Sequence, residues 1–290
     1  DRSVSRGLGD VYKRQIINLA VLVFFKYYGF LLNTIGGIIG IHIPHPELSL
    51  PIGLSFYTFR NLSYLFDIYL SKVSAQRNFL TFAVYSTMFP YTSAGPIVRY
   101  TDIETQLKQR TINISKFGTG AELFVKGLAK KVLLADNLSV LYSSICGHPQ
   151  MSVFTSWLGI LAYTMQLYFD FSGYSDMAIG LGKMLGFDFN KNFDYPYIST
   201  SVSEFWRRWH ISLGSWFRDY IYIPLGGNRV STLKHIRNIL VVWALTGLWH
   251  GASWNFVLWG VYYGLFLLLE KFVLQKYLKK IPSWLCTVYT

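Results

Sequence analysis

Long apolar runs, separated by short polar clusters, dominate this chain and predict an all-α protein that crosses a membrane. Two stretches, residues 137–169 and 238–269, contain no Asp, Glu, Lys or Arg. Each is longer than the roughly 20 apolar residues with which an α-helix spans a bilayer. Because several such runs follow one another, we expect a polytopic membrane protein rather than a soluble domain.

The first apolar runs predict two helices of different character. Residues 16–41 are expected to form a spanning helix that ends in a glycine-rich tail. Residues 51–70 are expected to form a second helix, which contains Arg60, Asn61 and Asp67. That helix is too polar to face lipid on every side, so it should line the protein interior.

The next segment should be irregular. Residues 79–98 are apolar but include Pro90 and Pro96, which cannot continue a helical hydrogen-bond ladder. A re-entrant or broken segment is therefore expected, with its free backbone groups satisfied by protein or water. Residues 115–145 then predict an amphipathic helix that continues into an apolar run.

A long apolar segment follows over residues 151–185 and contains two carboxylates, Asp170 and Asp176. A helix break near Gly173 would accommodate both of them. Two further spanning helices are expected, joined around residues 250–251, over residues 238–250 and 253–274.

The segment 204–223 has the most informative pattern of the chain. At about 100° per residue, one helical face would be aromatic and the opposite face polar. This pattern is typical of a helix that lies at a membrane interface or dips into a cavity. The aromatic face contains Trp206, Trp209, His210, Leu213, Trp216, Phe217 and Tyr220. The polar face contains Arg207, Arg208, Ser212, Ser215, Arg218 and Asp219.

The composition agrees with a lipid-embedded chain. Hydrophobic residues make up 52% of the 290 residues and charged residues 14%, against roughly 25% in an average soluble domain. The formal net charge of +12 is spread over short basic clusters beside apolar runs rather than along one polar face. We therefore expect an anionic lipid bilayer as the partner, and no nucleic acid. The clusters occupy residues 130–131, 207–208, 229–237 and 271–280.

Two of the six histidines have unusual surroundings. His250 lies at the end of a hydrophobic helix, and an ionisable residue at membrane depth is a candidate functional group. His210 lies in the middle of the aromatic face. A structural alternative stays open for both, because a histidine beside tryptophan near a helix end can simply anchor that helix at an interface.

Absent motifs narrow the type of reaction. The sequence has no Gly-x-Ser-x-Gly elbow, no Walker loop and no His-Glu-x-x-His pair. The two cysteines, Cys146 and Cys286, have no spacing that indicates a disulfide framework or a metal site. What remains is a histidine general base that removes a proton from a hydroxyl group, without a covalent nucleophile, metal or tightly bound cofactor.

Other polar groups have two interpretations each. Arg207 and Arg208 could bind the phosphates of an anionic acyl donor, or they could contact lipid headgroups. Asp170 and Asp176 could bind a cation or carry protons, or they could pair with Lys183 or cap the expected break.

Five blocks, in this order along the chain, resemble the membrane-bound O-acyltransferase family, and specifically its bacterial alginate O-acetyltransferase branch. They occupy residues 50–59, 94–99, 168–178, 204–213 and 247–251. The resemblance extends over nearly everything from residue 16 onward.

The resemblance implies a ring of tilted transmembrane helices, with re-entrant and interfacial helices, around a central tunnel. It implies a multi-pass protein of the bacterial inner membrane that moves acetyl from acetyl-CoA, or another acyl thioester, to hydroxyl groups of an exopolysaccharide. A separate periplasmic acetyltransferase is an expected partner. His250 matches the essential histidine of the family, and His210 matches its second conserved polar position. Candidates for substrate binding are Trp206, Arg207, Arg208 and Trp249.

Two other classes of function stay open from the sequence alone. A transporter or channel is motivated by Asp170 and Asp176 within an apolar segment, and a noncatalytic scaffold subunit is the third alternative. The ends of the chain carry a separate expectation. Residues 1–15 resemble a translated sequencing adapter and should be non-native, while residues 16–290 should form the family's catalytic domain without its C-terminal helices.

Overall fold

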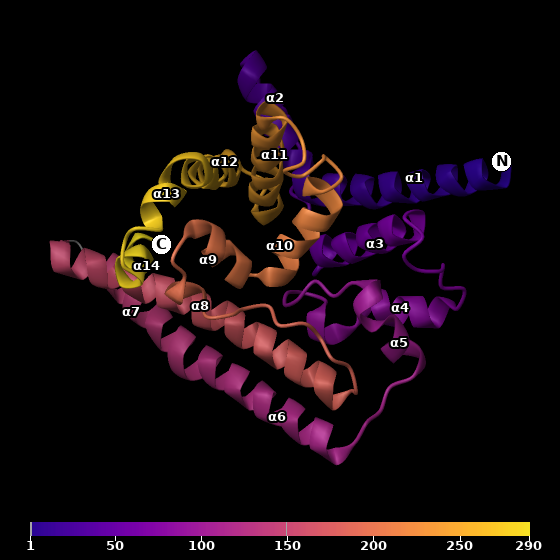
Figure 1. The fold of residues 1–290 in the computed structure, drawn as a ribbon. Helices are drawn as coiled ribbons and strands as arrows, with labels where there is room; N and C mark the ends of the chain where they lie inside the picture. Colours follow the sequence, from indigo (N-terminus) through magenta and orange to yellow (C-terminus); the bar gives the residue numbers. More distant parts are fainter. Residues whose placement is uncertain (1, 149) are drawn as a thin grey trace.

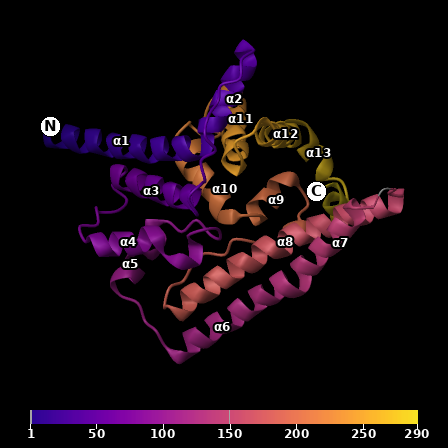
Figure 2. The same cartoon turned by 180° about the vertical axis from the view of Figure 1, so that it is seen from behind.

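All regular elements are helical in residues 2–148 and 150–290, the part of the chain that this computed structural model describes. The all-α expectation is therefore confirmed. Two short helices, α9 (Val202–Arg208) and α10 (Ile211–Phe217), lie in the middle of the molecule with the longer helices around them, as Figures 1 and 2 show from opposite sides. Within the described ranges, two helical stretches are long and apolar enough to cross a membrane, Val11–Ile39 and Trp254–Leu278.

The first expected spanning helix is present, but it is not one regular helix. Helix α1 (Arg2–Leu22) passes through a π-helical segment, η1 (Val23–Tyr27), into α2 (Tyr28–Ile39). The chain changes direction at this segment in both Figures 1 and 2. Such π segments occur mostly as single-turn insertions in α-helices, frequently at functional sites.

The second expected helix, α3 (Leu54–Tyr69), starts later than residue 51, after Gly53 in the left-handed conformation with φ +74°. Its polar residues point inward as predicted, because Arg60 and Asp67 are both buried. The Arg60 guanidinium donates to the Tyr91 and Ser86 carbonyl oxygens at 2.7 and 2.8 Å.

Arg60 thereby holds the irregular segment that the prolines predict. This segment consists of α4 (Phe79–Thr87) and a short 3₁₀ turn, η2 (Phe89–Tyr91), followed by bends and irregular chain up to residue 99. The expectation of a broken segment over residues 79–98 is confirmed. Helix α5 (Tyr100–Lys108) follows it.

An antiparallel pair of long helices forms one side of the molecule (Figure 1). One member runs through α6 (Ile114–Ala129), the π segment η3 (Lys130–Ala135) and α7 (Asp136–Cys146). The other is α8 (Val153–Met184), which is continuous over 32 residues. The expected break near Gly173 is therefore wrong.

The carboxylates of α8 explain why no break is needed. Asp176 pairs with Lys130, and Asp170 pairs with Lys131, each at 2.6 Å. Gly173 serves close packing instead, since a Cβ atom there would lie 2.7 Å from the carbonyl oxygen of Gly127 on α6. The partners of both carboxylates thus come from the neighbouring helix rather than from Lys183.

The two late helices are confirmed as a hairpin, formed by α11 (Thr232–His250) and α12 (Trp254–Leu269). Gly247 and Gly260 bring their backbones into contact, because a Cβ on either residue would collide with a carbonyl group of the other helix. This contact fixes the end of α11, where His250 lies. The remaining elements are η4 (Pro196–Ile198), η5 (Arg218–Tyr222), η6 (Glu270–Leu274), α13 (Gln275–Leu278) and α14 (Ser283–Tyr289).

Candidate active site

A cavity of about 790 Å³ lies between α9 and α10 on one side and α11 and the C-terminal segment from α12 onward on the other. Both singled-out histidines, His210 and His250, line it. His210 lies between α9 and α10 and His250 ends α11, 40 residues later in the sequence (250 − 210), so the fold brings together the two groups that the sequence singles out. Other lining residues include Trp206, Arg207, Trp243, Thr246, Glu270 and Lys271.

His250 is the last residue of α11, and its exposed surface faces this cavity. Aromatic rings surround the imidazole. Its centroid lies 4.9 Å from the ring of Trp249, 5.0 Å from that of Trp259 and 6.4 Å from that of Phe256. The ring is therefore confined laterally while it stays open to the cavity.

His210 interrupts the aromatic segment that the sequence predicts as one helix. The segment 204–223 is divided between α9, α10 and η5, and His210 between the first two has φ +45°. The left-handed region is unfavourable for a residue with a Cβ atom, so tertiary contacts must hold it there. Asn192 provides them, because its carbonyl oxygen accepts from the Ile211 amide at 2.9 Å and its side-chain Oδ1 accepts from the Ser212 amide at 3.1 Å.

The same Asn192 oxygen defines the protonation pattern of His210. Oδ1 accepts from the Ser212 amide and hydroxyl groups, and it lies 3.2 Å from His210 Nδ1. An acceptor in this position requires a proton on Nδ1, so the other nitrogen, Nε2, carries the free lone pair of the neutral ring. Within the described residues Nε2 is buried and has no hydrogen-bond partner.

An unpaired buried nitrogen costs about 1–3 kcal/mol, so it marks a position where a ligand can supply the missing hydrogen bond. His210 is itself only 2% exposed. Its ring is packed against Phe171, with centroids 4.8 Å apart, and lies 6.0 Å from Trp249. His210 is thus a rigid polar group in an aromatic wall.

A cluster of aromatic rings continues the wall from His250 toward α9. The ring of Trp206 lies 4.8 Å from Trp243, 5.0 Å from Tyr263 and 5.8 Å from Trp259. The indole N–H groups of Trp206 and Trp249 are buried donors without a partner in the described residues. The aromatic surroundings of the two histidines therefore offer unpaired donors as well as the unpaired acceptor of His210.

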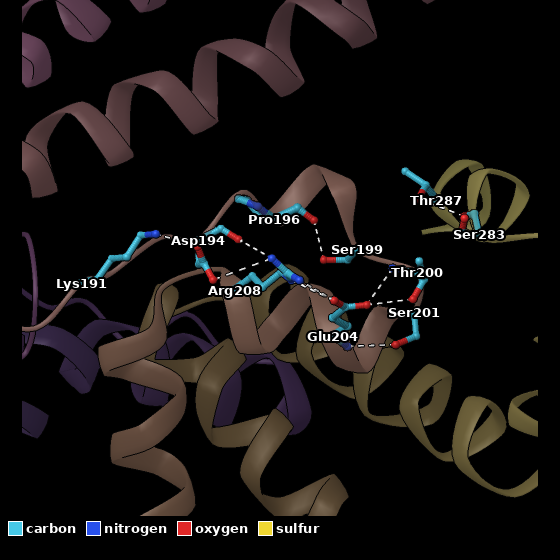
Figure 3. Close-up of polar contacts among 10 residues, drawn as sticks. All are labelled: Lys191, Asp194, Pro196, Ser199, Thr200, Ser201, Glu204, Arg208, Ser283 and Thr287. Atoms are coloured by element: carbon cyan, nitrogen blue, oxygen red, sulfur yellow. Dashed lines mark hydrogen bonds and ion pairs between the residues drawn. The ribbon is translucent and has the colours of Figure 1, made fainter. Parts of the chain in front are cut away.

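Glu204 fixes the start of α9, as Figure 3 shows. Its carboxylate accepts from the Thr200 amide and hydroxyl at 2.9 and 2.8 Å and from Arg208 Nε at 2.9 Å, while Ser201 Oγ caps the helix by accepting from the Glu204 amide at 3.1 Å. The hydrogen bond from the Thr200 amide is the main cause that lowers the pKa of Glu204 to about 2, with the Thr200 hydroxyl and Arg208 adding to it.

The sequence does not single out Glu270, although its carboxylate also caps α9. Its two oxygens accept from the Val202 and Ser203 amides at 2.7 and 3.0 Å, and the residue is 3% exposed. The sequence does contain a signal for Glu270, because this carboxylate directly follows the long charge-free stretch 238–269. Buried acidic groups in apolar helices need a partner, and here the N-terminus of another helix is that partner.

The four predicted substrate-binding residues do not all share the cavity. Trp206 and Arg207 line it, and Arg207 is exposed and forms no ion pair with the described part of the chain. Arg208 is not among the lining residues, because Glu204 and the Asp194 carbonyl oxygen hold its guanidinium. Trp249 is buried against Phe56 and Phe59 and does not line the cavity either.

A second cavity, of about 930 Å³, lies beside the turn that follows His250. Residues 252–254 line this second cavity, together with Lys26, Asn33 and His45 from the N-terminal part of the chain. The two linings have no described residue in common, so His250 at the end of α11 lines the first cavity and the turn that follows it lines the second.

Comparisons with known proteins identify the family of the chain. A family model described as MBOAT, membrane-bound O-acyltransferase family, matches residues 44–279. The probable alginate O-acetylase of Azotobacter vinelandii is 46% identical over 260 residues, which are 88% of this chain and 52% of that protein. The peptidoglycan O-acetyltransferase of Helicobacter pylori is 35% identical over 308 residues, covering 94% of this chain and 58% of that protein.

A more distant relative transfers a different acyl group. The teichoic acid D-alanyltransferase of Bacillus subtilis is 27% identical over 259 residues, covering 84% of this chain and 64% of that protein. The chain spans about half the length of the alginate O-acetylases that it matches.

Proposed function

The chain belongs to the membrane-bound O-acyltransferase family, and from this premise we propose that the cavity between His210 and His250 is where an acetyl group passes from a thioester to a hydroxyl of an extracytoplasmic polysaccharide. One observation carries the proposal. Two histidines from separate parts of the chain line one aromatic-walled cavity, and His210 has a buried ring nitrogen without a partner in the described residues.

In the proposed reaction His250 is the general base. Its imidazole accepts the hydroxyl proton of the acceptor while the hydroxyl oxygen attacks the thioester carbonyl carbon. The new C–O bond forms, the C–S bond breaks, and the proton passes from His250 to the departing thiolate. Histidine suits this task because its ordinary pKa is near neutrality.

His210 is proposed to orient a substrate rather than to react. Its Nε2 can accept a hydrogen bond from a hydroxyl group, and the contacts to Asn192 and Phe171 prevent the ring from turning away. A preoriented acceptor of this kind lowers the entropic cost of bringing two substrates together.

The donor is proposed to be acetyl-CoA or another acyl thioester. Arg207 and Lys271 line the cavity and offer positive charge to the phosphates of such a donor, and the indole N–H of Trp206 offers a hydrogen bond. His250 lines the first cavity and residues 252–254 line the second, and this arrangement supports entry of donor and acceptor from different sides. The placement of α9 and α10 at the centre supports a ring of helices around a passage (Figure 1).

The acceptor is proposed to be alginate or a related polymer, because relatives act on alginate, peptidoglycan and teichoic acid. These polymers lie outside the cytoplasm, so we place the protein in the bacterial inner membrane, in contact with anionic lipid and with a periplasmic acetyltransferase as a partner.

The proposal is tested in the full-length protein by His250→Ala. Exopolysaccharide from a host without its own enzyme should lose its O-acetyl esters, while the amount of membrane protein stays normal. His42→Ala, an exposed histidine in the loop after α2, is the matched control and should keep full acetylation. Retained esters with His250→Ala would remove His250 from the mechanism.

A transporter is the rival function, and the ion pairs of Asp170 and Asp176 with Lys131 and Lys130 favour a structural role for these carboxylates instead. Neither aspartate lines the cavity. Consumption of acetyl-CoA by purified protein separates the two functions, since a transporter returns its substrate chemically unchanged.

A further inference from the structure

Lys26 is a charged residue in the middle of an apolar helical stretch, Val11–Ile39. An ammonium group in such a place needs polar partners, because leaving water is costly for a charge. Its Nζ donates to the main-chain carbonyl oxygen of Trp249 and to Ser55 Oγ, the latter at 3.2 Å. Lys26 thus joins the first helix, the start of α3 and the end of α11.

The next residue makes a parallel contact. Tyr27 donates its hydroxyl hydrogen to the Leu248 carbonyl oxygen at 3.0 Å. The last carbonyl groups of an α-helix have no donor within that helix, so Leu248 and Trp249 need donors from elsewhere. The π segment η1 supplies two in succession, and the positive charge of Lys26 also meets the negative end of the α11 dipole.

These contacts end one residue before His250. The Lys26 ammonium also lies 5.6 Å from the ring centroid of Trp249, and that ring lies 4.9 Å from His250 and 6.0 Å from His210. A shift of the last turn of α11 would therefore move the imidazole of His250 relative to His210.

We propose that Lys26 is a positioning residue for acyl transfer, which together with Tyr27 holds the last turn of α11 so that His250 faces the cavity next to His210. The inference rests on the proposed function. Lys26 acts through the main chain of Trp249 and is not assigned a contact with either substrate. This role gives a reason for the lysine and the π segment in the middle of the apolar stretch Val11–Ile39.

The test uses the purified full-length protein, [¹⁴C]acetyl-CoA and deacetylated alginate oligosaccharides, with kcat and both KM values measured. Lys26→Met should lower kcat roughly 10- to 100-fold, since a displacement of about 1 Å at a reacting group has effects of this size. Both KM values should stay within about twofold, because no substrate contact is lost. Lys26→Arg keeps a charged donor and should recover kcat to within about threefold of the unaltered protein.

Two further variants make the result specific. Tyr27→Phe removes one hydroxyl from the same contact and should lower kcat by about three- to tenfold, roughly the value of one hydrogen bond. Lys108→Met, at an exposed lysine on α5, should leave kcat unchanged. Size-exclusion profiles and apparent Tm identify any variant that fails to fold. If Lys26→Met fails to fold, the kcat values of Tyr27→Phe and Lys26→Arg test the positioning role instead.

The outcomes separate this inference from the proposed function. Unaltered protein without acetyl transfer, or an active His250→Ala variant, would sink the proposed function itself. An active protein that His250→Ala inactivates but Lys26→Met leaves at full kcat would overturn only the role of Lys26. A Lys26→Met variant that raises the KM for alginate and keeps kcat would also overturn it, because Lys26 would then bind the acceptor in the second cavity.

Discussion

Asn192 Oδ1 lies 3.2 Å from His210 Nδ1 and also accepts hydrogen bonds from the amide and hydroxyl of Ser212. One buried side chain therefore sets the backbone conformation of His210, the start of α10 and the nitrogen that carries the proton of the imidazole. The orientation of the asparagine amide follows from the Ser212 amide, which can only donate. The Asn192 Nδ2 group donates to Ser175 Oγ on α8 at 3.0 Å.

Asn192→Ala should lower both stability and activity. The change leaves the Ser212 amide and His210 Nδ1 without their acceptor, and each unsatisfied buried group costs about 1–3 kcal/mol. The imidazole would also be free to turn, so kcat should fall by at least about tenfold. Apparent Tm and acetyl transfer by the full-length protein check both effects.

Asn192→Asp is the matched variant for this site. It keeps an acceptor toward Ser212 and His210, loses the donor to Ser175 and adds a buried carboxylate next to the His210 ring. It should retain more activity than Asn192→Ala. Equal activity of the two variants would show that the acceptor at position 192 has no part in the reaction.

Glu270→Ala should release the start of α9. Two charge-assisted hydrogen bonds to the Val202 and Ser203 amides disappear, and loss of a helix cap costs about 0.5–2 kcal/mol. Because Trp206 lies on this helix and lines the cavity, kcat should fall together with Tm. Glu270→Gln keeps one acceptor oxygen and should be milder in both measurements. A Tm that Glu270→Ala leaves unchanged would contradict the capping role.

Glu204 should make the stability of the protein depend on pH. Its pKa is about 2 in the folded protein, below the ordinary value of 4.5, because the Thr200 amide and hydroxyl and Arg208 favour the charged carboxylate. A carboxyl group with a lowered pKa in the folded protein stabilises the folded state, and this contribution is complete at pH values above the pKa of the unfolded chain. It is lost as the pH falls from about 4.5 toward 2. The unaltered protein should therefore have a higher apparent Tm than Glu204→Gln at pH 6.

That difference should shrink as the pH approaches 3, because the carboxylate then becomes protonated in the unfolded state. The measurement is a series of thermal unfolding curves in detergent between pH 6 and pH 3. Two parallel Tm profiles, with a constant offset across this range, would rule out the expected contribution of the Glu204 charge.

Gly127→Ala should loosen the pair of long helices. The added Cβ would lie 2.5 Å from the Gly173 carbonyl oxygen, a main-chain atom that cannot rotate away. Overpacking of this kind costs about 1–3 kcal/mol, so apparent Tm should fall clearly. Gly118→Ala, on the same helix with open space around the added atom, is the control and should be neutral or stabilising. Equal effects of the two changes would contradict the close contact.

Local pattern predicts much of the fold, because helices in apolar runs depend on short-range periodicity. The hairpin of α11 and α12, the broken segment after Arg60 and the inward direction of Arg60 and Asp67 all follow from residue type and spacing. His210 and His250 were also singled out from the sequence, and the structure brings them to one cavity. Their roles in catalysis stay predictions.

The errors concern contacts between distant segments. The aromatic periodicity of residues 204–223 continues across His210, so nothing local reveals the left-handed residue that Asn192 stabilises from outside the segment. The break expected near Gly173 fails for the same reason, since Lys130 and Lys131 reach α8 only after two glycine-lined helices pack together. Arg208 is different, because its partner Glu204 lies only one helical turn away and Asp194 adds a contact from outside the helix.

The glycine contact between α11 and α12 restricts how the walls of the cavity can move relative to each other. With the Gly247 and Gly260 backbones touching, this hairpin can shift only as one body, and His250 travels with it. The opposite wall is anchored separately, because Asn192 contacts His210 and donates to Ser175 on α8. A change in the width of the cavity is thus a movement of one intact wall against another and not a rearrangement within the hairpin.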